Sequence, residues 1–158
     1  MKNSMRALGT LVVGAGLAAC TFQGSAPQRP PAPTVPLAGH DLCGDHVGVF
    51  FDTDEEMHRR AAAVAADDRV RQVYTETKEQ AYVQFKEMFA DDPHLVELAS
   101  PEALPAGLQV LPLAGADVRA LADDLRQEHP GARIEVFVRP PFVPGQPPCP
   151  PNGLWPPR

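Results

Sequence analysis

Prolines concentrate at the two ends of this chain and limit where it can fold. Five of the 19 prolines lie in residues 21–40, and nine lie in residues 139–158. Proline has a fixed φ and no backbone N–H, so such segments favour extended, solvated chain that buries little apolar surface. We therefore expect the folded domain to span residues 43–140, with one modest core. We interpret residues 20–42 as a linker and residues 141–158 as an irregular tail.

Residues 1–19 have the pattern of an export signal. Lys2 and Arg6 precede a short apolar run at residues 8–16, and the sequence Leu-Ala-Ala-Cys follows it. A positive start, an apolar core and small residues in this order predict a secretory signal peptide. Leu-Ala-Ala-Cys resembles a bacterial lipobox, in which Cys20 carries lipid and becomes the mature N-terminus. The alternative is an ordinary signal peptide in which Cys20 has no such role.

Hydropathy and charge indicate how the mature protein would be attached to the membrane. No other apolar run reaches the roughly 18 residues of a transmembrane helix. We therefore expect the lipid on Cys20 to be the only attachment to the extracytoplasmic face of the cell membrane. Without Lys2 and Arg6, 12 of the 14 basic residues remain against 20 acidic ones, a net charge near −8. This charge argues against nucleic-acid binding and against lying flat on anionic lipid.

With Cys20 assigned to lipid, two cysteines remain, Cys43 and Cys149. Two cysteines in an exported protein predict a disulfide. The competing interpretation is a zinc site around Cys43. Its other ligands would come from His40, Asp41, Asp45 and His46. We favour the disulfide because the spacing matches no closed zinc site, and we expect neither a metal nor a cofactor.

The domain alternates between segments of strand period and segments of helix period. Period-two apolar patterns predict strands near residues 46–51, 70–74, 108–111 and 134–138. Helical spacing predicts helices after the first, second and third of these strands. The order predicts an α+β fold, a ferredoxin-like split β-α-β sheet with a small helical lobe inserted between the second and third strands. In that topology the first and last strands are antiparallel neighbours, which makes a bridge from Cys43 to Cys149 reasonable.

The predicted lobe, residues 75–106, carries more large apolar side chains than a surface connection needs. Thr77 and Gln80 have the spacing of a capping box, which predicts where its first helix begins. Ala81, Phe85, Met88 and Phe89 then form one helical stripe, and Tyr82 widens it. Such a stripe is usually a buried face. A lobe of this size has little core to offer, however, and methionine and aromatic side chains adapt well to partner surfaces.

Several short motifs in this region resemble the extracellular domain of the FtsX cell-division permease. The resemblance covers residues 47–138, nearly the whole predicted domain. Its motifs are Val49-Phe50-Phe51, Thr77-Lys78-Glu79-Gln80-Ala81, Phe85-Lys86-Glu87, Asp91-Asp92-Pro93 and Leu104-Pro105-Ala106.

The resemblance implies an adaptor that engages a peptidoglycan hydrolase or its coiled-coil regulator, in cell division or wall remodelling. In that family the domain lies between transmembrane helices and a cytoplasmic ATPase drives the permease, whereas this chain has a predicted lipid anchor instead. The family's smaller lobe helps to make the partner contact. Carried over by motif, the partner-binding candidates are Tyr82, Phe85, Met88, Phe89, Leu95 and Leu98. The alternative function is a wall-binding or small-ligand-binding lipoprotein with no hydrolase partner.

Catalysis has little support in the sequence. The three serines are Ser4, Ser25 and Ser100, and none stands in a Gly-x-Ser-x-Gly setting. There is no glycine-rich phosphate loop and no Cys-x-x-Cys pair. The paired acidic residues fit helix ends or solvated positions better than a glycosidase cleft, which needs aromatic side chains that are scarce here. We therefore expect a binding protein and not an enzyme.

Overall fold

The computed structural model describes residues 29–139, 145, 148–150 and 152–155 of the chain. The predicted signal peptide and Cys20 lie outside these residues. In chain order the elements are β1 (Thr34–Pro36), β2 (His46–Phe51), α1 (Asp54–Ala65), β3 (Val70–Glu76), α2 (Lys78–Met88), α3 (Pro93–Leu98), the 3-10 helix η1 (Pro101–Ala103), β4 (Ala106–Pro112), α4 (Val118–Glu128) and β5 (Arg133–Phe137).

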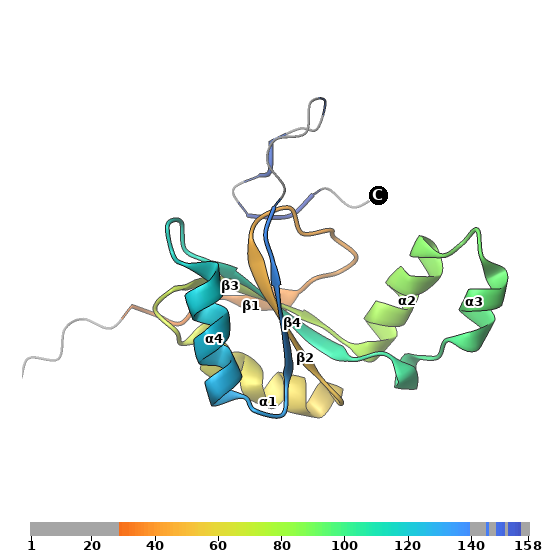
Figure 1. Ribbon diagram of the computed structural model, residues 1–158, viewed down its shortest axis with the longest axis horizontal. Coiled ribbons are helices and arrows are strands. Elements are labelled where there is room, and N and C mark those ends of the chain that lie inside the picture. The colour runs from red at the N-terminus through yellow and green to blue at the C-terminus, as the bar shows by residue number, and fades with distance from the viewer. Residues whose placement is uncertain (1–28, 140–144, 146–147, 151, 156–158) are drawn as a thin grey trace, which may run out of the picture.

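The strands form one sheet in the order β1-β3-β4-β2-β5 (Figure 1). β2 is antiparallel to both β4 and β5, and β3 is antiparallel to β4. Leaving β1 aside, this is the strand order of a ferredoxin-like split β-α-β sheet. The predicted fold class is confirmed, and so is the prediction that the first and last strands of that unit are neighbours.

Helices α1 and α4 cover one face of the sheet, and the main core lies between them and the strands (Figure 1). Alternation along the strands places the core residues in register, with Val47 opposite Val110 and Val49 opposite both Leu108 and Ile134. Met57 from α1 and Leu121 from α4 complete the layer and are fully buried. Burying each such side chain is worth about 1.5–3 kcal/mol, so this face supplies most of the stability of the domain.

The structure corrects the prediction that residues 20–42 are all linker. β1 pairs in parallel with β3, and Leu37 directly after it is only 4% exposed. Pro33 and Pro36 made this segment look unsuited to a sheet. An edge strand needs partners on one side only, however, so prolines are tolerated there. The Pro33 carbonyl accepts a hydrogen bond from the Val73 amide at 3.0 Å, which needs no proline N–H.

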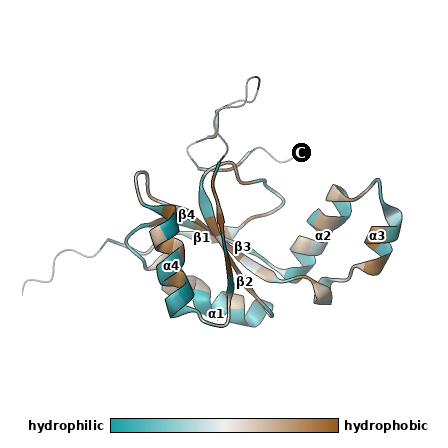
Figure 2. Ribbon diagram, in the orientation of Figure 1, coloured by the Kyte–Doolittle hydropathy of each residue, from teal (hydrophilic) through white to brown (hydrophobic). Residues whose placement is uncertain are grey.

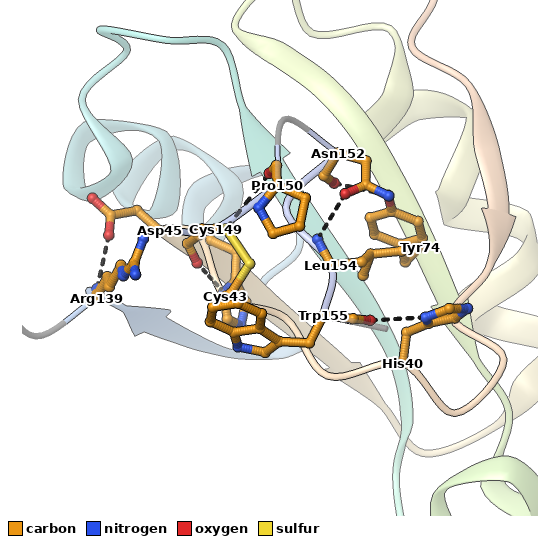
Figure 3. Close-up of a disulfide and its surroundings, with 12 residues drawn as sticks. His40, Cys43, Asp45, Tyr74, Arg139, Cys149, Pro150, Asn152, Leu154 and Trp155 are labelled. Carbon is orange, nitrogen blue, oxygen red and sulfur yellow. Dashed lines mark hydrogen bonds between the residues drawn. A yellow bond between two sulfur atoms is a disulfide. The ribbon is translucent and has the colours of Figure 1, made fainter. Parts of the chain in front are cut away.

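The second face of the sheet is partly covered by two segments that we call the strap, residues 37–43 and 152–155. Leu37, Leu42 and Leu154 pack there on Tyr74 and Leu111. Cys43 and Cys149 form a disulfide with their Cα atoms 5.6 Å apart (Figure 3). Both ends of the domain are thus folded onto the sheet, although their sequences are rich in proline.

Candidate functional site

The candidate site is the helical lobe, which we define as α2, α3 and η1 between β3 and β4. The lobe extends to one side of the sheet, away from α1 and α4 (Figure 1). α2 lies against η1 and β4. No residue of the three elements is buried, whereas α1 and α4 each bury several apolar side chains. The lobe is therefore an appendage of the domain and not part of its core.

Local hydrogen bonds fix where the lobe begins. The Thr77 hydroxyl accepts from the Gln80 amide at 3.3 Å, and the Gln80 side chain accepts from the Thr77 amide at 2.9 Å. The predicted capping box is therefore confirmed. Lys78 ties this helix start to the turn after β2, because its amide donates to Asp54 and its ammonium donates to the Asp52 carbonyl. These bonds orient α2 relative to the sheet.

The second helix of the lobe begins at Asp92. Its carboxylate accepts from the Leu95 amide at 3.1 Å, and Pro93 occupies the first turn, where its missing N–H costs nothing. Leu95 and Val96 are half-buried, and Leu98 points its apolar side chain into solvent at 72% exposure.

The aromatic side chains on α2 and at its end contact each other or a lysine of the same helix. The rings of Phe85 and Phe89 contact each other with centroids 4.6 Å apart and planes tilted by 43°. The Lys86 ammonium lies 4.6 Å from the centre of the Tyr82 ring. All three aromatic side chains are half-buried. They are therefore held in place by contacts within the lobe while part of each stays accessible.

The structure places the six predicted partner-binding residues on two neighbouring helices. Tyr82, Phe85, Met88 and Phe89 lie on α2 or at its end, and Leu95 and Leu98 lie on α3. Met88 and Leu98 are each 72% exposed, more than any other large apolar side chain of the described residues. Val83, which lies outside the predicted stripe, is also exposed at 43%. It sits between polar residues in the helix period, so no sequence signal marks it.

A cleft of about 520 Å³ lies between the sheet and the end of the lobe that leads from η1 into β4. Its lining includes the apolar Phe50 and Leu104. Its charged lining residues are Asp52, Lys78, Glu102 and Arg133. The Arg133 guanidinium lies over the Phe50 ring, 4.8 Å from its centre. The cleft adjoins the lobe, so a partner on the lobe has a concave surface beside it.

A buried carboxyl group lies at the base of the lobe. Glu76, two residues before α2, is 9% exposed, and its Oε1 has no hydrogen-bond partner among the described residues. Burial raises the pKa of Glu76 because the charged carboxylate is poorly solvated there.

Comparison with known families identifies the domain. A family model described as the FtsX extracellular domain matches residues 46–129. The chain belongs to this family. The match begins at β2 and ends after α4, so it includes the whole helical lobe. Searches of curated proteins and of solved structures each found no match.

As an FtsX extracellular domain, the protein is an extracytoplasmic domain related to cell division. Within the described residues, none of the helices has the length and apolar character to cross a bilayer. The same residues contain no group of three or more His, Cys, Asp or Glu side chains placed to hold a metal ion. The Cys43 sulfur is bonded to Cys149, which removes the thiolate on which the alternative zinc site depended.

Proposed function

We propose that this FtsX extracellular domain is a non-catalytic adaptor that captures a protein partner on its helical lobe. The partner would be a peptidoglycan hydrolase or its coiled-coil regulator, and lipid on Cys20 would hold the adaptor at the membrane. The observation that carries the proposal is the exposure of Met88 and Leu98 on a lobe with no buried residue.

The free energy available from burying exposed apolar side chains favours partner binding over a purely structural role. A side chain of leucine or methionine gains about 1.5–3 kcal/mol on leaving water, and at 72% exposure most of that gain is unused in the free domain. Phe85 and Phe89, on α2 and at its end, are half-buried and extend the apolar area near Met88. Both α2 and α3 carry hydrophobic stretches among hydrophilic ones (Figure 2). Two short helices with apolar anchors suit contact with a helix of a coiled coil, the helix-in-groove mode of recognition.

The adaptor role needs no chemistry from the lobe. Binding would localise the partner, because a lipid-anchored adaptor keeps it near the membrane surface and raises its local concentration there. Flexible methionine and aromatic side chains can adapt their rotamers to the partner at little cost.

The experiment is capture from detergent-solubilised envelope by the full chain and by a Met88→Ser, Leu98→Ser double variant. We expect the wild type to retain a hydrolase or coiled-coil protein, and the double variant to lose it by roughly tenfold or more. The matched control is Val35→Ser, which removes an exposed apolar side chain from β1, outside the lobe. Equal capture by all three proteins would reject the proposal.

A further inference from the structure

A second cavity lies at the opposite end of the sheet from the base of the lobe, between the strap and the end of β5. Its volume is about 270 Å³, slightly below the roughly 300–1,000 Å³ typical of drug-sized ligand sites. The side chains that matter for its chemistry come from Leu42, His46, Phe137, Val138, Arg139 and Trp155. We call it the tail pocket, because the C-terminal tail supplies one of its walls.

The family match does not account for the tail pocket. The match spans residues 46–129, and of the six side chains only His46 falls inside it. Trp155, the one tryptophan of the chain, comes from the proline-rich tail. The tail pocket therefore lies mostly outside the matched region.

The walls of the tail pocket are held by fixed contacts. The His46 and Phe137 rings stack across β2 and β5 with centroids 4.6 Å apart and planes 12° from parallel. The Trp155 amide donates to the Asp41 carbonyl at 2.8 Å, and its own carbonyl accepts from His40 Nδ1 at 3.0 Å. The disulfide adds a covalent tie beside them (Figure 3). A preformed wall costs little ordering entropy when a ligand binds.

The positive charge of Arg139 lies at this pocket. The Arg139 backbone amide donates to the Asp45 carboxylate at 2.7 Å, but its guanidinium makes no hydrogen bond or ion pair within the described part of the chain. No carboxylate is among the described lining residues. The Asp45 carboxylate lies beside the pocket, and Arg139 is the one arginine or lysine among the described lining residues, in a chain with a net charge of −6. A guanidinium offers two parallel N–H donors that match a carboxylate.

His46 adds a hydrogen-bond acceptor of defined tautomer. Its Nδ1 lies 2.8 Å from the Gly44 carbonyl, which can only accept, so Nδ1 carries the proton. Burial lowers the pKa of His46, so the ring is neutral at pH 7 and Nε2 is left as an acceptor.

We propose that the tail pocket binds a small ligand that has a carboxylate beside an apolar body, of about the size of a dipeptide or a single sugar ring. Arg139 holds the carboxylate, and Trp155 and Phe137 enclose the body. Two sources share this chemistry outside the cytoplasm, the C-terminus of a short peptide and a sugar acid. The proposal does not depend on the helical lobe or on the adaptor role.

The test measures binding to the full chain in detergent by titration calorimetry and saturation-transfer NMR. The probes are acetyl-D-alanyl-D-alanine, its C-terminal amide, and N-acetylmuramic acid. We expect at least one carboxylate to bind, and roughly tenfold weaker binding for the amide, because it lacks the charge-assisted bond. Binding of the dipeptide alone identifies a peptide C-terminus as the source, and binding of the sugar alone identifies a sugar acid.

Three variants locate the site. Arg139→Gln should weaken binding of the carboxylate probe by roughly tenfold with an unchanged unfolding temperature, since the guanidinium makes no hydrogen bond or ion pair with the residues that the structure describes. Trp155→Ala should also weaken it. Arg119→Gln, which removes an exposed arginine on α4, should bind like the wild type. Failure of every probe to bind, equal binding of acid and amide, or wild-type affinity in Arg139→Gln would each overturn the proposal. Partner capture by the lobe is unaffected by any of these outcomes.

Discussion

Phe85 and Phe89 contact each other across one turn of α2, with ring centroids 4.6 Å apart, in a helix that buries none of its residues. Such an aromatic pair contributes about 0.5–1.5 kcal/mol beyond the area it buries. The pair therefore gives the lobe internal cohesion where the main core gives it none. Met88, one residue before Phe89, is exposed to solvent.

The lobe should open independently of the sheet. Few buried contacts mean a low free energy of local unfolding. In native-state hydrogen exchange we expect the amides of α2 and α3 to exchange much faster than those of β2 and β4. Phe85→Ala should accelerate exchange in α2 further and leave β4 unchanged. Protection of α2 equal to that of β4 would show that the lobe is part of the core.

Glu76 should lower stability at neutral pH. Because its pKa is raised, Glu76 binds its proton more tightly in the folded protein than in the unfolded chain. Its contribution to the free energy of unfolding is therefore most favourable below the ordinary pKa of 4.5 and is lost as pH rises through the folded pKa. We expect Glu76→Gln to raise the free energy of unfolding by about 1 kcal/mol at pH 7.5, because a buried charge is removed. Near pH 4 the gain should largely vanish. Urea unfolding at both pH values measures this, and a loss of stability at pH 7.5 would contradict it.

His129 should make the domain sensitive to mild acid. It is 5% exposed beside Phe51, and neither ring nitrogen has a hydrogen-bond partner among the described residues. Burial first, and then the charge of Arg60, lower its pKa below the ordinary 6.5. As pH falls, His129 therefore takes up a proton at a higher pH in the unfolded chain than in the folded protein. The free energy of unfolding decreases as pH falls below about 6.5 towards the folded pKa.

The variant that checks this is His129→Leu. Its free energy of unfolding should fall less than that of the wild type between pH 7.5 and pH 5.5. Asp67 does not contribute to the pH dependence of stability in this window. The hydrogen bond from Arg69 lowers its pKa, so Asp67 titrates below the ordinary value of 3.8. The same pH slope in both proteins would show that His129 does not titrate on unfolding.

The disulfide should stabilise the domain and hold the strap. Cys43 and Cys149 are 106 residues apart in sequence, and loss of a native disulfide from a small exported domain costs about 2–5 kcal/mol. We expect a Cys43→Ser, Cys149→Ser double variant to unfold at a lower temperature and to lose ligand binding in the tail pocket. Partner capture should persist, since neither Met88 nor Leu98 belongs to the apolar cluster that the strap forms on the sheet. An unchanged unfolding temperature would contradict this assignment.

The sheet was predictable because its strands carry clear periods. Val47, Val49 and Phe51 alternate with residues of the other face, and Met57, Ala61 and Val64 recur at helical spacing, so each element and its buried side follow from local pattern. The order of these elements then leaves few compact topologies, of which the ferredoxin-like one is observed.

β1 and the strap were not predictable for a physical reason. β1 has three residues, of which the last is Pro36, and so short a segment has no measurable period. Its place in the sheet depends on a free edge of β3 that only the tertiary structure creates. The exposure of Met88 could be anticipated from the small size of the lobe but not from the stripe itself. A stripe of Ala81, Phe85 and Met88 looks the same whether it faces a core or a partner, and only the position of the lobe beside the sheet decides between them.

The most direct test of the adaptor role is site-specific photo-crosslinking in intact cells. A photoreactive residue replaces Met88 in one variant and Ala62, an exposed position on α1, in the other. We predict that position 88 crosslinks to a peptidoglycan hydrolase or a coiled-coil regulator and that position 62 does not. The same products from both positions, or no protein product from position 88, would contradict the central claim that the lobe is the partner-binding surface.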